Sequence, residues 1–158
     1  MIDKIDAKLL EIIQQNAHLA NTVLAERVGL TKTAVFERIR KMEAAGIIQT
    51  YETRLNPKQV GVGQLAFIYV RAEDRPGDTK TGNMLAKIPQ VLEVHHIAGE
   101  DCYLVKVRVK DTEALGNLLR EKIGKIKSVR STRTTIVFNT LKETACLPLD
   151  RLSEEQDE

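Results

Sequence analysis

Two helices joined by a tight turn are predicted by the stretch Thr22-Val-Leu-Ala-Glu-Arg-Val-Gly-Leu-Thr-Lys-Thr-Ala-Val-Phe-Glu-Arg-Ile-Arg-Lys41. Gly29 can adopt a positive φ at no steric cost, so it can end the first helix and begin the turn. Either Thr31 or Thr33 can cap the second helix through its side-chain oxygen. A small residue, Ala25, falls where the two helices meet. This spacing is typical of a helix-turn-helix.

The second of these helices is expected to have one buried and one charged side. Val35, Ile39 and Met42 share a face at the helical period. Lysine and arginine on the other side can neutralise phosphates or bind guanine, and threonine or glutamate can contact bases or phosphates. An ordinary amphipathic helix pair with a solvated face would give the same pattern. The DNA-contacting residues that we predict are Thr31, Lys32, Thr33, Glu37, Arg38 and Lys41.

Composition limits the class of protein. The 158 residues carry a formal charge of +2, so a DNA-binding surface must concentrate its positive charge locally. Cys102 and Cys146 give no disulfide framework. No apolar run approaches the ~20 residues of a membrane helix, and the first residues lack a signal core. We therefore expect a cytoplasmic protein with no membrane partner.

The N-terminal part is predicted to be a three-helix unit. An apolar stripe over residues 5–13 predicts a helix that packs behind the other two, and residues 43–46 look like a helix end with a glycine cap. Residues 47–55 are β-prone, which suggests a winged variant. Proline and glycine within residues 56–63 indicate a linker. The predicted domains are residues 1–60, 61–145 and a tail of 146–158, and we expect the acidic segment of the last nine residues to be frayed.

The second half is predicted to be an α+β domain of the ferredoxin-like βαββαβ type. A short helix containing Met84, Leu85 and Ile88 is expected to end at Pro89, and Asp111 or Thr112 is expected to cap a longer one. The buried face of that longer helix would comprise Ala114, Leu115, Leu118, Leu119 and Ile123. The predicted strands are residues 66–71, 91–98, 102–110 and 130–141.

One face of this sheet should remain without helices. We assign to it the alternating apolar residues Ala66, Ile68, Val70, Leu104 and Val137. An antiparallel sheet with two apolar faces usually has a second partner. A second copy of the chain is the expected partner, and a homodimer would also supply two DNA-binding units for two half-sites.

Taken together, the two halves resemble the leucine-responsive/AsnC (feast/famine) family of transcription regulators. No single motif decides this resemblance, but the order of the motifs over one chain does. The motifs are Ile5-Asp6-Ala-Lys-Leu9-Leu10, Leu24-Ala25-Glu-Arg-Val28-Gly29-Leu30, Arg38-Ile39-Arg-Lys-Met42-Glu43-Ala-Ala-Gly46-Ile47-Ile48, Gly99, Tyr103-Leu104, Arg108, Asp111, Thr132-Arg133-Thr134 and Leu147-Pro148-Leu149.

The resemblance implies a regulator that binds operator DNA, dimerises through the βαββαβ domain and often assembles further, for example into octamers. It also implies an effector, usually a free amino acid, in a cleft between dimers. The positions that match this cleft are Gly99, Glu100, Asp101, Cys102, Tyr103, Thr132, Thr134 and Ile136. The family usually has an acidic residue where this chain has Cys102, and a thiol cannot supply the same charge at neutral pH unless its pKa is lowered.

Two other functions fit parts of the sequence. Certain sirohaem decarboxylases resemble the same two-domain architecture and would use histidines, but a cationic second helix is of little use to an enzyme. His95 and His96 are adjacent on a predicted strand and should point to opposite faces, so a shared metal is not expected. An effector-free chromatin-architectural protein is the other alternative. We expect no catalytic residues, metal or cofactor.

Overall fold

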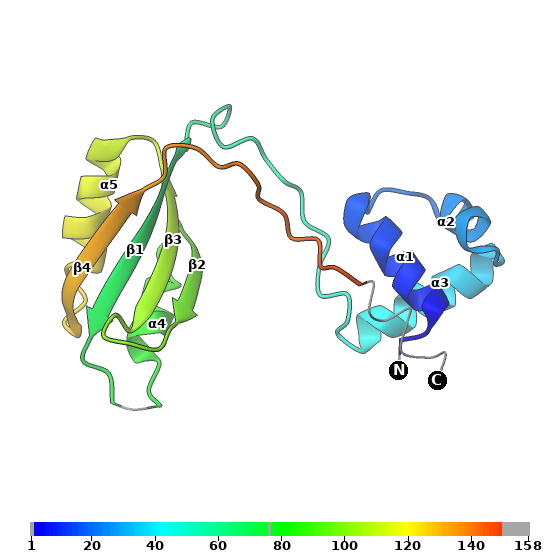
Figure 1. Cartoon of the computed structure of the whole chain (residues 1–158), viewed down its shortest axis with the longest axis horizontal. Helices are drawn as coiled ribbons and strands as arrows, with labels where there is room; N and C mark the ends of the chain where they lie inside the picture. Colours follow the sequence, from blue (N-terminus) through cyan, green and yellow to red (C-terminus); the bar gives the residue numbers. More distant parts are fainter. Residues whose placement is uncertain (1, 76, 150–158) are drawn as a thin grey trace. The chain divides into compact units, whose positions relative to one another are not determined.

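The computed structural model describes residues 2–75 and 77–149. The chain divides into two compact units (Figure 1). The first comprises the chain up to Thr53 together with the segment from Lys142 onward, and the second is Arg54–Leu141. Residues 142–149 thus group with the N-terminal helices, although they follow the second unit in sequence.

The first unit is built on the three expected helices, α1 (Lys4–Gln15), α2 (Asn21–Val28) and α3 (Lys32–Ala44). Their apolar stripes meet in a small core, as the helical spacing predicts. Val35 is fully buried and Met42 nearly so, and the partly buried Ile39 packs against the same core. The buried core residues are Leu9, Leu10, Ile13, Leu24, Ala25, Val35 and Met42.

Local caps explain where these helices begin and end. Gly29 follows α2 with a φ of 71°, and the side chain of Thr31 accepts a hydrogen bond from the Ala34 N–H at 3.2 Å. After α3, Gly46 has a φ of 70° and the Ile47 N–H donates to the Met42 carbonyl, which closes a Schellman motif. Both predicted glycine ends are therefore confirmed, and Thr31 rather than Thr33 is the cap.

The strand expected over residues 47–55 is not formed, and this prediction is wrong for the described structure. The backbone of this segment is irregular, and most of its side chains are exposed. A β-prone segment needs a partner strand to satisfy its N–H and C=O groups, and none is provided within the first unit. Tyr51 instead packs its ring beside α3 and donates a hydrogen bond to Glu43 at 2.9 Å.

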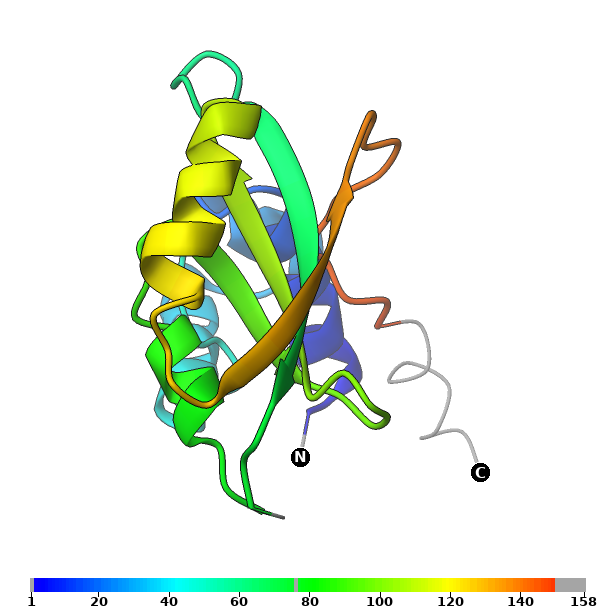
Figure 2. The same ribbon diagram turned by 90° about the vertical axis from the view of Figure 1, so that its left-hand side faces the viewer.

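The second unit has the predicted βαββαβ order. Its four strands form one antiparallel sheet in the order β2-β3-β1-β4, the ferredoxin-like arrangement, and α4 and α5 lie on the same face of the sheet (Figure 2). The elements are β1 (Gln64–Ala72), α4 (Lys80–Leu85), β2 (Val91–His96), β3 (Tyr103–Val109), α5 (Thr112–Leu118), a π-helical turn η1 (Leu119–Ile123) and β4 (Val129–Ile136).

β4 is shorter than the predicted strand of residues 130–141. It pairs only with β1, and the last backbone hydrogen bond between them runs from the Val137 N–H to the Leu65 carbonyl at 3.0 Å. Because β1 begins at Gln64, the chain beyond has no strand to pair with. Phe138 and Leu141 are accordingly almost fully exposed.

The strand register corrects the assignment of residues to the sheet faces. Ala66, Ile68 and Val70 lie opposite Val107, Val105 and Tyr103. Directly opposite residues share a face, so all six belong to the side covered by helices. The expectation that Ala66, Ile68 and Val70 lie on the open face is therefore wrong, because alternation shows which residues share a face but not which face the helices cover.

The open face nevertheless carries apolar side chains. Leu104 lies opposite Tyr69 on this face, and Phe67 is two residues from Tyr69 along β1. All three side chains are partly buried within the chain. The open face is therefore more apolar than a fully solvated sheet surface.

The C-terminal segment is attached to α1. The side chain of Gln14 donates to the Leu147 carbonyl at 3.2 Å and accepts from the Leu147 N–H at 2.6 Å. Leu149 packs against the core of the first unit. The fraying expected for residues 150–158 lies outside the described residues.

Candidate DNA-binding helix and effector edge

α3 presents a polar outer surface. Thr33, Glu37 and Lys41 are spaced by four residues and lie along one line of the helix, opposite the buried Val35 and Met42. Thr31 and Lys32 are exposed at the N-terminal end of the same helix. Five of the six predicted DNA-contacting residues are thus exposed together, and these are groups that can reach phosphates and base edges in a groove.

Arg38, the sixth predicted residue, is bound within the unit. Its Nη1 lies 2.5 Å from Oδ2 of Asp3 and 2.8 Å from Oδ1 of Asp6, at the start of α1. The hydrogen bonds to Asp6 and Asp3 raise the pKa of Arg38. Burial acts to raise the pKa of Asp3, but hydrogen bonds from the Asp6 N–H and from Arg38 lower it below its ordinary value. These contacts hold α3 against α1.

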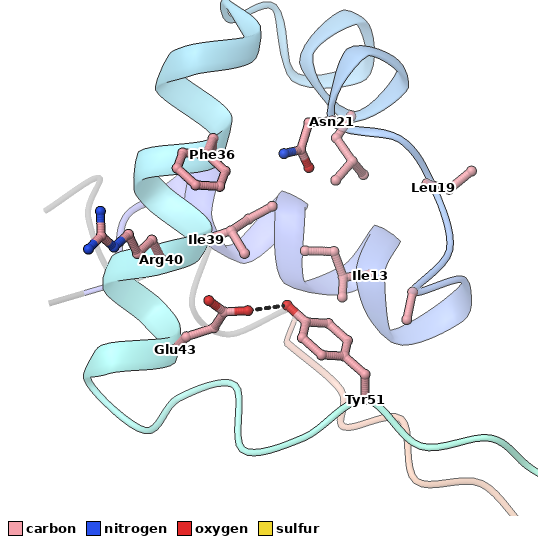
Figure 3. A pocket seen from close by; sticks show the side chains of 10 residues that line it. Ile13, Leu19, Asn21, Phe36, Ile39, Arg40, Glu43 and Tyr51 are labelled. Carbon is pink, nitrogen blue, oxygen red and sulfur yellow. Dashed lines mark hydrogen bonds between the residues drawn. The ribbon is translucent and has the colours of Figure 1, made fainter.

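The other flank of α3 borders a hollow of about 440 Å³. Phe36, half exposed, and Ile39 line its apolar side, as Figure 3 shows, and the hydrogen bond between Glu43 and Tyr51 joins two other lining side chains. Burial and this hydrogen bond raise the pKa of Tyr51 to about 12. The bond fixes the segment after α3 beside the helix.

The turn between β2 and β3 is a compact polar loop. Gly99 has a φ of 120°, which favours glycine, and the Ile97 N–H donates to the Cys102 carbonyl at 2.9 Å. Asp101 pairs with Arg133 of β4 at 2.9 Å. The Arg133 guanidinium also lies 4.0 Å from the centre of the Tyr69 ring. The turn is thereby linked across β1 to the edge strand.

The side chain of Tyr103 is buried and belongs to a hydrogen-bond network inside the second unit. It is only 1% exposed, and its hydroxyl donates to Asp74 at 2.5 Å. The buried Thr81 hydroxyl donates to the other oxygen of Asp74 and lies 2.6 Å from the Ser128 hydroxyl. Burial and the bond to Asp74 raise the pKa of Tyr103 to about 12. This network holds the end of the sheet against α4.

The predicted effector residues are only partly brought together. Glu100 is exposed in the turn, Asp101 is partly buried, and the Cys102 thiol donates to the Ala72 carbonyl at 3.3 Å. Thr134 and Ile136 lie two and four residues beyond Thr132 on β4, roughly 7 and 14 Å along the strand. In the single chain these residues outline an edge of the second unit rather than an enclosed pocket.

The two adjacent histidines point to opposite faces, as predicted. His96 stacks on Tyr103 on the helix side, with ring centres 5.1 Å apart, whereas His95 contacts Glu93 at 3.1 Å on the open face. A hydrogen bond from Lys106, opposed by burial and supplemented by His95, lowers the pKa of Glu93. Across residues 2–75 and 77–149, no group of three or more His, Cys, Asp or Glu residues is placed to hold a metal ion.

Comparison with known proteins decides the family. Residues 2–49 match a winged helix-turn-helix DNA-binding domain, and residues 65–147 match the Lrp/AsnC ligand binding domain. The chain belongs to the Lrp/AsnC family. It is therefore a transcriptional regulator with an N-terminal DNA-binding domain, as the sequence predicted.

The similarity to relatives of this Lrp/AsnC regulator extends over nearly the whole chain. An HTH-type transcriptional regulator of Pyrococcus abyssi is 37% identical, over 90% of this chain and 97% of its own. The leucine-responsive regulatory protein of Escherichia coli is 32% identical, over 90% of this chain and 88% of its own. A transcriptional regulator of Neisseria meningitidis, solved with L-methionine, is 30% identical with a TM-score of 0.90, over 96% of this chain and 99% of its own.

Several residues of this Lrp/AsnC chain with clear structural roles escaped sequence reasoning. Asp3 and Asp6 have the spacing of a capping box, a signal that could have been found. Asp74 and Arg133 act through partners 29 and 32 residues away, which no local pattern indicates. No helix in the described part of the chain is long and apolar enough to span a membrane.

Proposed function

We propose that this regulator binds operator DNA through the outer surface of α3, acts as a homodimer or a larger assembly such as an octamer, and responds to a free amino acid. The observation that carries the proposal is the surface of α3 itself. Thr31, Lys32, Thr33, Glu37 and Lys41 are exposed together on a helix that is capped and packed on its other side. A helix of this kind fits the major groove.

DNA binding is tested by the salt dependence of a variant. Lys41→Ala should weaken binding to operator fragments and lower the slope of log K against log salt by about 1, because one phosphate contact is lost. Lys87→Ala, which removes an exposed lysine beyond α4 in the second unit, is the matched control and should leave both values unchanged. Equal slopes for Lys41→Ala and the unmodified protein would refute the assignment of Lys41.

Selectivity separates a regulator from an architectural protein. A regulator should protect discrete sites with regular spacing and should bind them at least ~10³-fold more tightly than unrelated DNA. An architectural protein would cover DNA with little sequence preference and a strong salt dependence. Footprinting of genomic fragments in the presence of competitor DNA distinguishes the two.

The amino-acid effector is proposed from the turn and the neighbouring strand. Asp101, whose carboxylate pairs with Arg133 in the single chain, offers that carboxylate to an ammonium group, and the N–H groups of the turn can bind the carboxylate of the ligand. The L-methionine bound by the Neisseria meningitidis regulator supports this ligand class. Because Cys102 stands where the family usually has an acid, the ammonium partner in this chain is proposed to be Asp101.

A thermal-shift screen against free amino acids tests the effector. At least one amino acid should raise the unfolding temperature, and Asp101→Asn should abolish this shift. Glu113→Gln, an exposed change at the start of α5, should retain it. An identical shift in the Asp101→Asn variant would exclude Asp101 as the ammonium partner.

A further inference from the structure

We propose that Arg38 is a positioning residue of DNA binding, which sets the orientation of α3 through Asp3 and Asp6 and does not itself contact DNA. The inference rests on DNA binding by α3. It differs from the expectation drawn from sequence, in which Arg38 shares the DNA-contacting surface with Lys41.

Each of the two carboxylates in this contact accepts two hydrogen bonds, one from a backbone N–H and one from Arg38. Asp3 accepts from the Asp6 N–H through Oδ1 and from Arg38 through Oδ2. Asp6 accepts from the Asp3 N–H through Oδ2 and from Arg38 through Oδ1. The two backbone bonds form the capping box that begins α1. Arg38 therefore binds the second oxygen of each carboxylate in a capping box that the backbone hydrogen bonds already fix.

The contact of Arg38 with Asp3 and Asp6 adds directional hydrogen bonds, which the apolar core between the helices lacks. Contacts of Val35 and Met42 with their neighbours are not directional, so they allow small rotations of α3 about its axis. A charge-assisted hydrogen bond pair from the middle of α3 to the first turn of α1 is directional. Because Arg38 adjoins Glu37 and lies three residues before Lys41, its position sets where those side chains point.

The burial of the contact also favours the positioning role. The Asp6 side chain is 14% exposed and the Arg38 side chain 31% exposed, whereas the Asp3 side chain is 43% exposed, so the pair with Asp6 is the more buried of the two. If Arg38 turned toward a phosphate, it would leave two carboxylates three residues apart at the start of α1 without a cationic partner, and these would repel each other and the DNA. The position of Arg38 thus favours binding to α1 over binding to a nucleic acid.

A mutant cycle on the full chain tests the proposal. Asp3→Asn/Asp6→Asn should weaken operator binding by about 3- to 30-fold, although no DNA-contacting group is removed. Adding Arg38→Ala to that background should weaken binding no further, because Arg38 acts only through the two carboxylates. The salt slope should be the same in all of these variants.

Lys41→Ala serves as the reference for a direct contact. Lys41→Ala should lower the salt slope by about 1, and its loss of affinity should be smaller in the Asp3→Asn/Asp6→Asn background, because α3 is then no longer held in the orientation that directs Lys41 to the DNA. If Arg38→Ala behaves as Lys41→Ala does, Arg38 contacts DNA and the proposal is overturned. If Arg38→Ala does not fold, Arg38→Lys, which lacks the planar guanidinium, replaces it in the same comparison. Failure of the unmodified protein to bind DNA would instead refute the proposed function.

Discussion

The end of the sheet depends on one close contact between a glycine and a tyrosine. Tyr103 is one of the predicted effector residues, but its ring stacks on His96 and faces Gly82 of α4, and its hydroxyl donates to Asp74. Gly82 of α4 faces this ring, and a Cβ built there would lie 2.7 Å from Cε1 of Tyr103. The space beside the Tyr103 ring therefore favours glycine at position 82.

The change Gly82→Ala should therefore destabilise the second unit. The clash should lower the free energy of unfolding by about 1–3 kcal/mol. Alanine is otherwise favoured over glycine in a helix by about 1 kcal/mol, so the sign of the change reports the contact with Tyr103. Urea unfolding followed by circular dichroism and tyrosine fluorescence measures the effect.

A matched glycine provides the control for this change. A Cβ at Gly116, in α5, would meet only Nη1 of Arg120 at 3.3 Å, the mobile end of a long side chain. Gly116→Ala should be neutral or stabilising by up to about 1 kcal/mol. Equal effects of the two substitutions would contradict the proposed role of the Tyr103 contact.

At the scale of the elements, the start of α3 combines a structural and a functional role. Thr31 caps the helix through its bond to the Ala34 N–H and is also exposed at the end of the proposed DNA-binding surface. The two roles respond differently to substitution. A cap requires any side chain with a well-placed oxygen, whereas binding to phosphate excludes a negative charge.

Substitution of Thr31 can therefore separate the cap from the DNA contact. Thr31→Ala should destabilise the first unit by about 1 kcal/mol, and Thr31→Asp should restore that stability because aspartate is a good cap. Thr31→Asp should nevertheless bind DNA more weakly than the unmodified protein. Thermal unfolding and DNA titration are the two measurements.

Thr33, two residues after Thr31, provides the control for the effect of the cap on stability. It lies inside α3 and is exposed, so Thr33→Ala should change the stability by less than about 0.5 kcal/mol. A loss equal to that of Thr31→Ala would show that capping is not the source of the effect.

At the scale of the whole molecule, the open face of the sheet is the proposed dimer interface. Phe67, Tyr69 and Leu104 remain partly exposed there, on the side away from α4 and α5. Burying this apolar surface against a second copy would stabilise the assembly, at about 25 cal/mol per Å² of apolar surface removed from water. The interface would also bring two DNA-binding units into one molecule.

The substitution Leu104→Glu should dissociate this dimer. A charge buried between two apolar sheets is unfavourable, so the variant should sediment at the mass of one chain where the unmodified protein is dimeric. Lys87→Glu, an exposed charge change outside the strands, should leave the mass unchanged. A Leu104→Glu variant that keeps the mass of the unmodified protein would exclude the open face as the interface.

Much of the architecture was available from the sequence alone because its determinants are local. The three N-terminal helices follow from apolar spacing and from caps such as Gly29, Thr31 and Gly46. The βαββαβ order follows from the change of period in the second half. The opposite orientation of His95 and His96 follows from the geometry of a strand.

The tertiary structure decided what depends on distant partners. The register between β1 and β3 placed Ala66, Ile68 and Val70 under the helices, and the lack of a partner left residues 47–55 without a strand. The sequence predicts Arg38 as a DNA contact, because its partners Asp3 and Asp6 lie more than 30 residues away and no local pattern indicates them. Periodicity specifies which residues share a face, whereas only packing specifies what that face meets.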